Sequence, residues 1–189
     1  RHVLCETPFT QTYKETQELY QLAEKKGLIL ALALKTAYCP SFIQILENVR
    51  QGYIGEVVEL TTATTTLLAQ GVSTSFNNER LAENAIYGML ATIKVMGAKY
   101  KQATAFTKED DERILYLDLM MEYADAIAHI KAGTGVKSES SMVVSGTKGY
   151  IYVPAPWWKT DYFEVRYENQ SNNKRYFYQL DGEGIRYEL

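Results

Sequence analysis

The segment His2-Val3-Leu4-Cys5-Glu6-Thr7-Pro8 contains the first predicted strand and the residues on which the interpretation of the whole chain depends. Its apolar part, Val3 to Cys5, has the length of a short buried strand, and the charged Glu6 ends it. A residue before proline prefers extended geometry, so Thr7-Pro8 predicts a strand that runs out into a loop. The carboxyl end of a strand is therefore expected at Glu6 and Thr7.

A helix and a second strand are predicted directly after this segment. Residues 13–23 carry apolar side chains at helical spacing, with Thr10 as the expected N-cap and Gly27 as the stop. Leu28 to Leu34 is a continuous apolar run, which is typical of a strand buried on both faces of a parallel sheet. Residues 3–34 therefore predict a right-handed βαβ unit.

The middle of the chain predicts two more helices around one long strand. A helix is expected to start at Pro40 and to end near Gly52, and residues 54–66 then read as a strand rich in threonine. Residues 70–79 have no hydrophobic period and are interpreted as a loop. Residues 80–96 regain helical periodicity and predict the next helix.

After Gly97 the hydrophobic period changes to two, which indicates strands. The predicted strands are Tyr100–Thr107, Ile114–Met120, Glu122–Lys131, Ser138–Ser145, Gly149–Val153, Tyr162–Glu168 and Lys174–Leu180. Turns are expected at Asp110-Asp111, Gly133–Gly135, Gly146–Gly149 and Ser171–Asn173. Many antiparallel strands after a few helices predict an α+β fold with one open sheet.

The composition excludes several functional classes. The 189 residues carry a net charge of −3 with a pI near 5.5, so the basic face of a nucleic-acid-binding protein is not expected. No apolar run reaches the length of a membrane span, and residues 1–6 do not resemble a signal peptide. The two cysteines, Cys5 and Cys39, have no metal-ligand spacing and are predicted to be buried free thiols in a reducing cytoplasm. With only two histidines, His2 and His129, no metal site is predicted.

Residues 2–8 resemble the strand-end motif His-Val-Leu-Cys-Glu-Lys-Pro of the glucose–fructose oxidoreductase / inositol dehydrogenase (Gfo/Idh/MocA) family. Further segments resemble that family in order and spacing: Gly27–Tyr38, Gly52–Glu56 (its "GxIGE" turn), Tyr87 with Met96-Gly97 (its "DxGxY…LxG" helix) and Gly146–Ile151 (its "GTKG" hairpin). The resemblance implies two units. Residues 1–34 match the end of a Rossmann NAD(P)-binding domain, and residues 35–189 match a C-terminal α/β domain with a large open, mostly antiparallel sheet and helices on one face.

The resemblance also implies an activity and its cofactor. Family members transfer a hydride between NAD or NADP and a sugar, sugar phosphate or cyclitol. The glycine-rich phosphate loop of such a fold is absent here, so a longer parent protein is expected to supply it. The resemblance places cofactor contacts at Glu6, Thr7 and Pro8, catalytic groups at Tyr87 and Thr7, and substrate contacts at Glu83, Tyr87 and Lys35. Trp158 is a further candidate substrate contact because of its aromatic ring.

Several family positions are altered in this chain. The catalytic lysine is replaced by Thr7, which cannot carry a positive charge. Other functional positions of the family match Leu32, Asn78, Glu79, Glu83 and Ala85, whereas its tyrosine is kept as Tyr87. Loss of such a charged group commonly costs on the order of 10²–10⁴ in rate. The chain by itself is therefore expected to be inactive.

Each candidate site residue also has an ordinary structural interpretation. Glu83 and Tyr87 share a helix face at spacing i, i+4, as many unrelated pairs do. Thr7-Pro8 is also compatible with a simple turn, and Trp157-Trp158-Lys159 either offers an aromatic platform to a sugar or packs over the sheet edge. His129, among alanines on a strand, is interpreted as a sheet residue with its hydrogen bonds satisfied. The acidic run Glu109–Glu112 is interpreted as a solvated turn.

Three functional hypotheses follow from the sequence. The first is the substrate-binding and oligomerising part of an NAD(P)-dependent oxidoreductase with a sugar-like ligand. The second is a catalytically inactive relative kept as a binding or assembly module, and the third is a purely structural dimerisation domain. The family pairs its open sheets in dimers, so a homo-oligomer is expected, with Tyr116, Tyr123, Tyr152 or Tyr167 on the paired face. Neither a nucleic-acid nor a membrane partner is expected.

Overall fold

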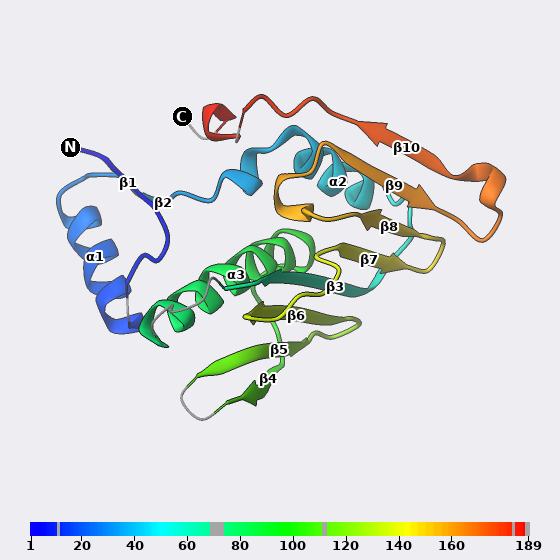
Figure 1. The fold of residues 1–189 in the computed structure, drawn as a ribbon. Coiled ribbons are helices and arrows are strands. Elements are labelled where there is room, and N and C mark those ends of the chain that lie inside the picture. The colour runs from blue at the N-terminus through cyan, green and yellow to red at the C-terminus, as the bar shows by residue number, and fades with distance from the viewer. Residues whose placement is uncertain (11, 69–73, 111–112, 183, 188–189) are drawn as a thin grey trace.

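The structure of the protein is a computed structural model that describes residues 1–10, 12–68, 74–110, 113–182 and 184–187. Its α-helices are α1 (Tyr13–Lys25), α2 (Pro40–Arg50) and α3 (Thr74–Met96). Its strands are β1 (Val3–Cys5), β2 (Leu30–Leu32), β3 (Val57–Thr66), β4 (Gln102–Glu109), β5 (Ile114–Glu122), β6 (Ile127–Thr134), β7 (Met142–Gly146), β8 (Tyr150–Val153), β9 (Tyr162–Arg166) and β10 (Lys174–Phe177). Figure 1 shows a small N-terminal βαβ unit beside a large sheet covered by α2 and α3.

The N-terminal βαβ unit is confirmed. β1 and β2 are parallel neighbours, with Val3 opposite Leu30 and Cys5 opposite Leu32. The predicted N-cap is wrong by two residues: Thr12, not Thr10, caps α1. Its side chain accepts from the backbone N–H of Glu15, and the Glu15 carboxylate accepts from the backbone N–H of Thr12. This reciprocal capping box satisfies two backbone donors of the first turn at once, which explains the choice of Thr12.

The predicted burial of the strand Val3–Cys5, and of the strand Leu28–Leu34 on both faces, is wrong. Val3 is 50% exposed and Ile29, just before β2, is 64% exposed, while α1 has no buried residue. Two strands and one helix have too little surface to cover one another's apolar faces. The apolar sequence of this unit therefore lies largely at the surface of the described structure.

The predicted open sheet with helices on one face is confirmed. Its strand order is β10-β9-β8-β7-β3-β6-β5-β4, and all neighbours are antiparallel except β3 and β6. Leu60 lies opposite Ala128 on one side and Val144 on the other, and all three side chains are fully buried. They belong to one core cluster with Phe42 of α2 and Ala91 of α3. Both helices therefore cover the same face of the sheet.

Two element boundaries differ from the sequence prediction. Residues 74–79, predicted as loop, form the first turns of α3, and Asp111 of a predicted turn lies outside the described residues. The predicted strand Glu122–Lys131 is in fact divided: Glu122 ends β5, and β6 starts only at Ile127. The backbone N–H of Tyr123 donates to the carbonyl of Ala126 and closes a tight turn. The alternating sequence pattern runs through this turn without a break, so it did not indicate the end of the strand.

Two segments that resemble the family, the turn Gly52–Glu56 and the hairpin Gly146–Ile151, are hydrogen-bonded to each other. The backbone N–H of Thr147 donates to the carbonyl of Glu56, and that of Lys148 donates to the carbonyl of Ile54. Gly55 has a φ of +76°, and a Cβ there would collide with the Thr147 hydroxyl. A residue with a side chain is thus excluded at this turn for two independent reasons. The turn and the hairpin, about ninety residues apart, form one structural unit at the start of β3.

Helix α3 lies unusually close to the sheet. A Cβ on Gly88 would come within 2.5 Å of the Thr62 hydroxyl and 2.6 Å of Ile130 Cγ2. One turn earlier, the buried Asn84 side chain donates to the carbonyl of Gly133 at 2.9 Å and to the hydroxyl of Thr66 at 3.2 Å. These contacts fix the N-terminal half of α3 at the ends of β3 and β6, where the candidate site lies.

Candidate functional site

A cleft separates the βαβ unit from α3. It has a volume of about 320 Å³ and is bounded by Thr7 and Pro8 after β1, Leu32 at the end of β2, and Glu83 and Ile86 of α3. In parallel α/β sheets, ligands bind outside the carboxyl ends of the strands, and the cleft occupies this position at β1 and β2. Three of the sequence-predicted residues, Thr7, Pro8 and Glu83, thus line one cleft.

The charge of this cleft is set by Glu83. Its carboxylate is partly exposed and lies 3.6 Å from the Arg80 guanidinium, one turn earlier on α3. The described lining includes hydroxyls at Thr7, Thr10 and Tyr20 but no lysine or arginine. The cleft therefore offers a carboxylate and neutral hydrogen-bonding groups, and lacks a cation in its own wall.

Tyr87 and Trp158 contact each other beside the cleft. Their ring centroids are 6.3 Å apart with the planes inclined by 30°, and both rings are half-buried. Trp157 is 1% exposed, and its indole N–H donates to the carbonyl of Ala63 at 3.0 Å. The Trp157-Trp158 pair thus has divided roles: Trp157 packs over the sheet, and Trp158 reaches the helix that carries Tyr87.

The remaining predicted site residues lie apart from the cleft wall. Lys35 begins a short 3₁₀ turn, Lys35–Tyr38, between β2 and α2, and lies near Gly184 in the C-terminal segment. Glu6 follows β1 on the exposed side of the chain. The 3₁₀ turn contacts the Trp157-Trp158 segment, because the Thr36 hydroxyl donates to the backbone carbonyl of Trp158 at 2.6 Å.

A second cavity, of about 540 Å³, lies at the carboxyl end of β3. Its wall consists of Thr65, Thr66, Leu67, Lys137, Ser140, Ala155, Pro156 and Trp158. Of the predicted residues only Trp158 belongs to it. The sequence pattern did not indicate this cavity, because its wall comes from segments up to ninety residues apart in the chain.

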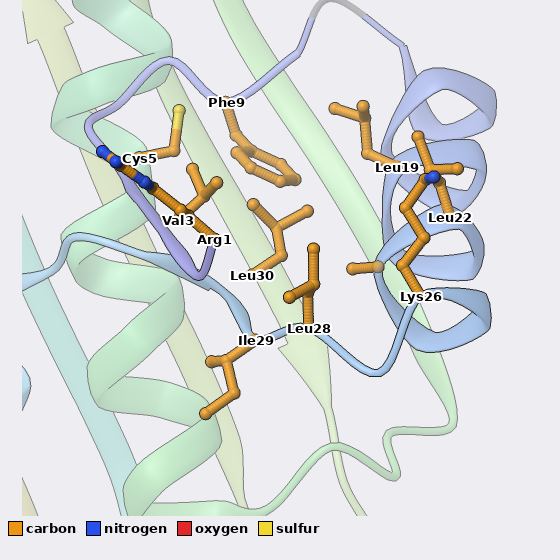
Figure 2. A pocket seen from close by; sticks show the side chains of 11 residues that line it. Arg1, Val3, Cys5, Phe9, Leu19, Leu22, Lys26, Leu28, Ile29 and Leu30 are labelled. Atoms are coloured by element: carbon orange, nitrogen blue, oxygen red, sulfur yellow. The ribbon is translucent and has the colours of Figure 1, made fainter.

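A third hollow lies on the outer face of the βαβ unit and is almost wholly apolar. Figure 2 shows Val3, Phe9, Leu19 and Leu30 directed toward one another between the strands and α1, with Lys26 on the helix side. It has a volume of about 280 Å³. Apolar walls without paired polar groups are suited to packing against further protein rather than to binding a polar ligand.

The open face of the large sheet carries a buried charge cluster. Glu164, 9% exposed, accepts from Arg166 Nε at 2.6 Å and from the Tyr162 hydroxyl, and Arg175 Nε lies 3.6 Å away. The hydrogen bond from Arg166 holds the pKa of the Glu164 carboxyl below its usual value, with a second contribution from Tyr162. The Arg166 guanidinium also lies over the Tyr152 ring at 4.5 Å.

Of the four tyrosines expected on the open face, Tyr116 and Tyr152 share the face of Glu164, as their strand registers require. Tyr123 is buried and donates to the carbonyl of Gly97, and Tyr167 packs against the core cluster. The Nδ1 atom of His129 is hydrogen-bonded to the Asp118 carboxylate at 3.1 Å, in agreement with the interpretation of His129 as a sheet residue. The two cysteines are free thiols, of which only Cys39 is buried.

The described part of the chain contains no cluster of three or more His, Cys, Asp or Glu side chains able to hold a metal ion. Within the same residues, no helix combines the length and the apolar character required to cross a bilayer.

Parts of this chain are similar to oxidoreductases of known sequence. An uncharacterised oxidoreductase of Schizosaccharomyces pombe is 44% identical over 59 residues, which are 31% of this chain and 16% of that protein. The scyllo-inositol 2-dehydrogenase (NADP(+)) IolU of Bacillus subtilis is 38% identical over 61 residues, 32% of this chain and 18% of the enzyme. The matched segments thus span less than a fifth of these relatives. No protein-family profile matches the chain.

Solved structures share the fold over nearly the whole chain. KijD10, a 3-ketoreductase from Actinomadura kijaniata solved with NADP and TDP-benzene, superposes with a TM-score of 0.83 at 15% identity, over 99% of this chain and 60% of that one. The oxidoreductase yvaA from Bacillus subtilis superposes with a TM-score of 0.75 at 15% identity, over 100% of this chain and 62% of that one. This chain therefore has the fold of about three fifths of larger NAD(P)-binding oxidoreductases, and its sequence relatives are oxidoreductases as well.

Proposed function

We propose that this chain is the substrate-binding and oligomerising part of an NAD(P)-dependent oxidoreductase of the Gfo/Idh/MocA family. Its substrate class is a sugar, sugar phosphate or cyclitol. The dehydrogenase acting on scyllo-inositol and the ketoreductase solved with a TDP ligand support this class, because both are similar to this chain. The division into a cofactor-side unit, residues 1–34, and a substrate-side domain, residues 35–189, is part of the proposal.

The observation that carries this proposal is the cleft between the carboxyl ends of β1 and β2 and the face of α3. Thr7 and Pro8 occupy one wall and Glu83 the other, so a small molecule in the cleft touches both units at once. Binding sites occur preferentially at such junctions between structural units. In an oxidoreductase, this is where a cofactor bound by one unit meets a substrate bound by the other.

The cleft fits one end of a nicotinamide cofactor. Pro8, Leu32 and Ile86 offer apolar contact to a flat ring, and the Thr7 hydroxyl offers a hydrogen bond. The pyrophosphate needs a glycine-rich turn or a cation, and the described wall contains neither. Among the described residues, the cleft wall therefore offers contacts to the nicotinamide end only. When bound, the cofactor exchanges a hydride with a substrate carbon.

The chain's own groups have two tasks in this chemistry. Glu83, in the cleft wall, accepts hydrogen bonds from substrate hydroxyls and so orients the carbon that reacts. Tyr87, one turn further along α3, is the candidate proton donor or acceptor for the reacting oxygen.

The second candidate function is a catalytically inactive relative that serves as a binding or assembly module. Thr7 favours it, because the resemblance puts a lysine there and the described cleft wall has no other cation. Without that charge, the stabilisation that a lysine at this position gives to an oxyanion is lost. Substrate binding requires neither, so the cleft retains a use in such a module.

The open sheet face is proposed as the surface that pairs in a homo-oligomer. It combines aromatic rings, such as Tyr152, with a charge network whose members are already satisfied within the chain. Such a face buries well against a second copy, because few polar groups are left unpaired. The free thiols of Cys5 and Cys39 are consistent with a reducing cytoplasm, which we include in the proposal.

Calorimetric titration with NADH and NADPH tests the function. A full-length protein that contains this chain is expected to bind one of them saturably, and to transfer hydride to or from a compound of the proposed class. No heat at millimolar cofactor contradicts the oxidoreductase and leaves the binding module. The same titration of residues 1–189 alone is expected to show at most weak binding, because the described cleft wall offers the pyrophosphate neither a glycine-rich turn nor a cation.

A further inference from the structure

The cavity at the carboxyl end of β3 adjoins the candidate active-site helix. Trp158 in its wall contacts Tyr87, with 6.3 Å between ring centroids, and Thr66 accepts a hydrogen bond from Asn84 at 3.2 Å. Asn84 directly follows Glu83, which lines the cleft on the other side. The cavity wall thus contacts the same part of α3 whose Glu83 lines the cleft.

The polar groups of this cavity are chemically distinctive. Ser140 and Thr65 are buried and satisfied by each other, with 3.2 Å between their hydroxyl oxygens, so they form a rigid wall. Thr66 accepts from Asn84, which leaves its hydroxyl hydrogen able to donate. Lys137 supplies a cation, and no ion pair is recorded for it among the described residues. The wall contains no carboxylate to neutralise that charge.

Trp158 gives the same cavity an aromatic wall. Trp158 is half-buried, and its ring meets Trp157 edge-on with ring centroids 6.3 Å apart, while the Thr36 hydroxyl donates to the backbone carbonyl of Trp158. A ring fixed in this way presents a preformed surface on which the C–H face of a sugar, or a nucleobase, can stack. The cavity therefore combines an aromatic surface with a cation and a hydroxyl donor.

We propose that this cavity binds a phosphorylated sugar, with the phosphoryl group at Lys137 and Thr66 and the adjoining ring against Trp158. The inference rests on the proposed function, because it assigns the end of the substrate that points away from the reacting carbon. A lysine ammonium binds phosphate as a point charge, and the volume of about 540 Å³ accommodates a hexose phosphate. The phosphoryl group belongs either to a sugar monophosphate or to a nucleoside diphosphate sugar.

Binding to the 189-residue chain tests this directly, with the indole N–H signal of Trp158 as the readout in NMR titrations. The probes are glucose 6-phosphate, TDP, unphosphorylated glucose and inorganic phosphate. Glucose 6-phosphate or TDP is expected to shift the signal saturably, whereas glucose is expected to bind at least tenfold more weakly. The tighter of the two phosphorylated probes identifies the source of the phosphoryl group. If neither shifts the signal, the proposal is wrong.

A matched pair of variants makes the assignment specific. Lys137→Gln is expected to weaken binding of the phosphorylated probe about tenfold, and Lys99→Gln to leave it unchanged. Lys99, like Lys137, is exposed, but it follows the C-terminal end of α3 and does not belong to the cavity wall. Equal binding by both variants overturns the proposal. Since no cofactor takes part, this result is independent of the NADH and NADPH titration that tests the proposed function.

Discussion

Thr7 is the residue that distinguishes the two candidate functions, an active oxidoreductase and an inactive binding module. It lines the cleft opposite Glu83, in a wall whose described residues include no cation. In a full-length protein with a working cofactor site, Thr7→Lys is expected to raise turnover about tenfold or more, because an ammonium there stabilises charge at the reacting oxygen. The measurement is the initial rate of NADH or NADPH oxidation with a panel of sugar-derived ketones.

A matched lysine elsewhere in the same cleft controls for charge alone. Thr10 also lines the cleft but lies three residues further along the chain than Thr7, so Thr10→Lys is expected to leave the rate unchanged. Equal gains in both variants would mean that any cation helps, without a role for the position. No gain from Thr7→Lys would mean that the pocket has lost the catalytic geometry, which favours the binding module.

Glu164 is a buried carboxylate at the centre of the charge cluster on the open face. Because its folded pKa is lowered by Arg166 and Tyr162, the ionised form stabilises the fold above the usual value near 4.5 and the benefit is lost as pH falls. Glu164→Gln is expected to lower the free energy of unfolding at neutral pH by about 2 kcal/mol. It should also flatten the dependence on pH below that value, as measured by urea unfolding at several pH values.

Glu168→Gln, at an exposed position shortly after β9, is the control and should keep the wild-type pH dependence. A Glu164→Gln variant with unchanged stability and slope would mean that the cluster is solvated rather than structural. That outcome would also weaken the proposal that this face pairs with a second copy.

Among the elements, α3 decides the geometry of the site, because its Glu83 faces the cleft while Asn84 holds the sheet. Gly88 permits this close approach. Gly88→Ala is expected to destabilise the protein by about 1–2 kcal/mol, because the added methyl meets Thr62 and Ile130. The clash outweighs the gain of up to about 1 kcal/mol that alanine brings to a helix interior.

Urea unfolding measures this difference, with Met89→Ala on the exposed side of the same helix as the control. The control is expected to change stability by less than about 0.5 kcal/mol. A Gly88→Ala variant as stable as the wild type would show that α3 can move away from the sheet without cost. The position of Glu83 in the cleft wall would then be less firmly fixed than the contacts indicate.

At the scale of the whole molecule, α2 and α3 cover one face of the large sheet, and no described helix covers the other. Val143 lies on it, opposite Thr61 on one side and Tyr152 on the other. If two copies pair through this face, Val143→Asp is expected to weaken the dimer about a hundredfold or more, because it buries an unpaired charge. Light scattering after size exclusion gives the mass of each variant.

Ile43→Asp is the matched control, since Ile43 is an exposed apolar residue on α2, on the other side of the sheet. It is expected to keep the wild-type mass. A wild-type protein that is already monomeric at high concentration contradicts the proposed pairing. So does a Val143→Asp variant that keeps the mass of the wild type.

The local pattern of the sequence determined the type of nearly every element, because helices and strands differ in hydrophobic period. The βαβ unit, α2 and the strands after Gly97 were all predicted, as was the open sheet. Two of the errors arose where a side-chain hydrogen bond or a tight turn determines the boundary of an element. Thr12 displaced Thr10 as N-cap through its exchange with Glu15, and the turn at Tyr123 to Ala126 interrupted an alternating run.

Only the tertiary structure decided which residues share a site, because that depends on contacts between segments far apart in the chain. Thr7 and Glu83 meet across a cleft, and the cavity of Lys137 and Trp158 was not indicated by any local pattern. The exposure of Val3 and Ile29 was equally beyond the sequence. An apolar run predicts a strand, whereas its burial depends on how much of the surrounding fold is there to cover it.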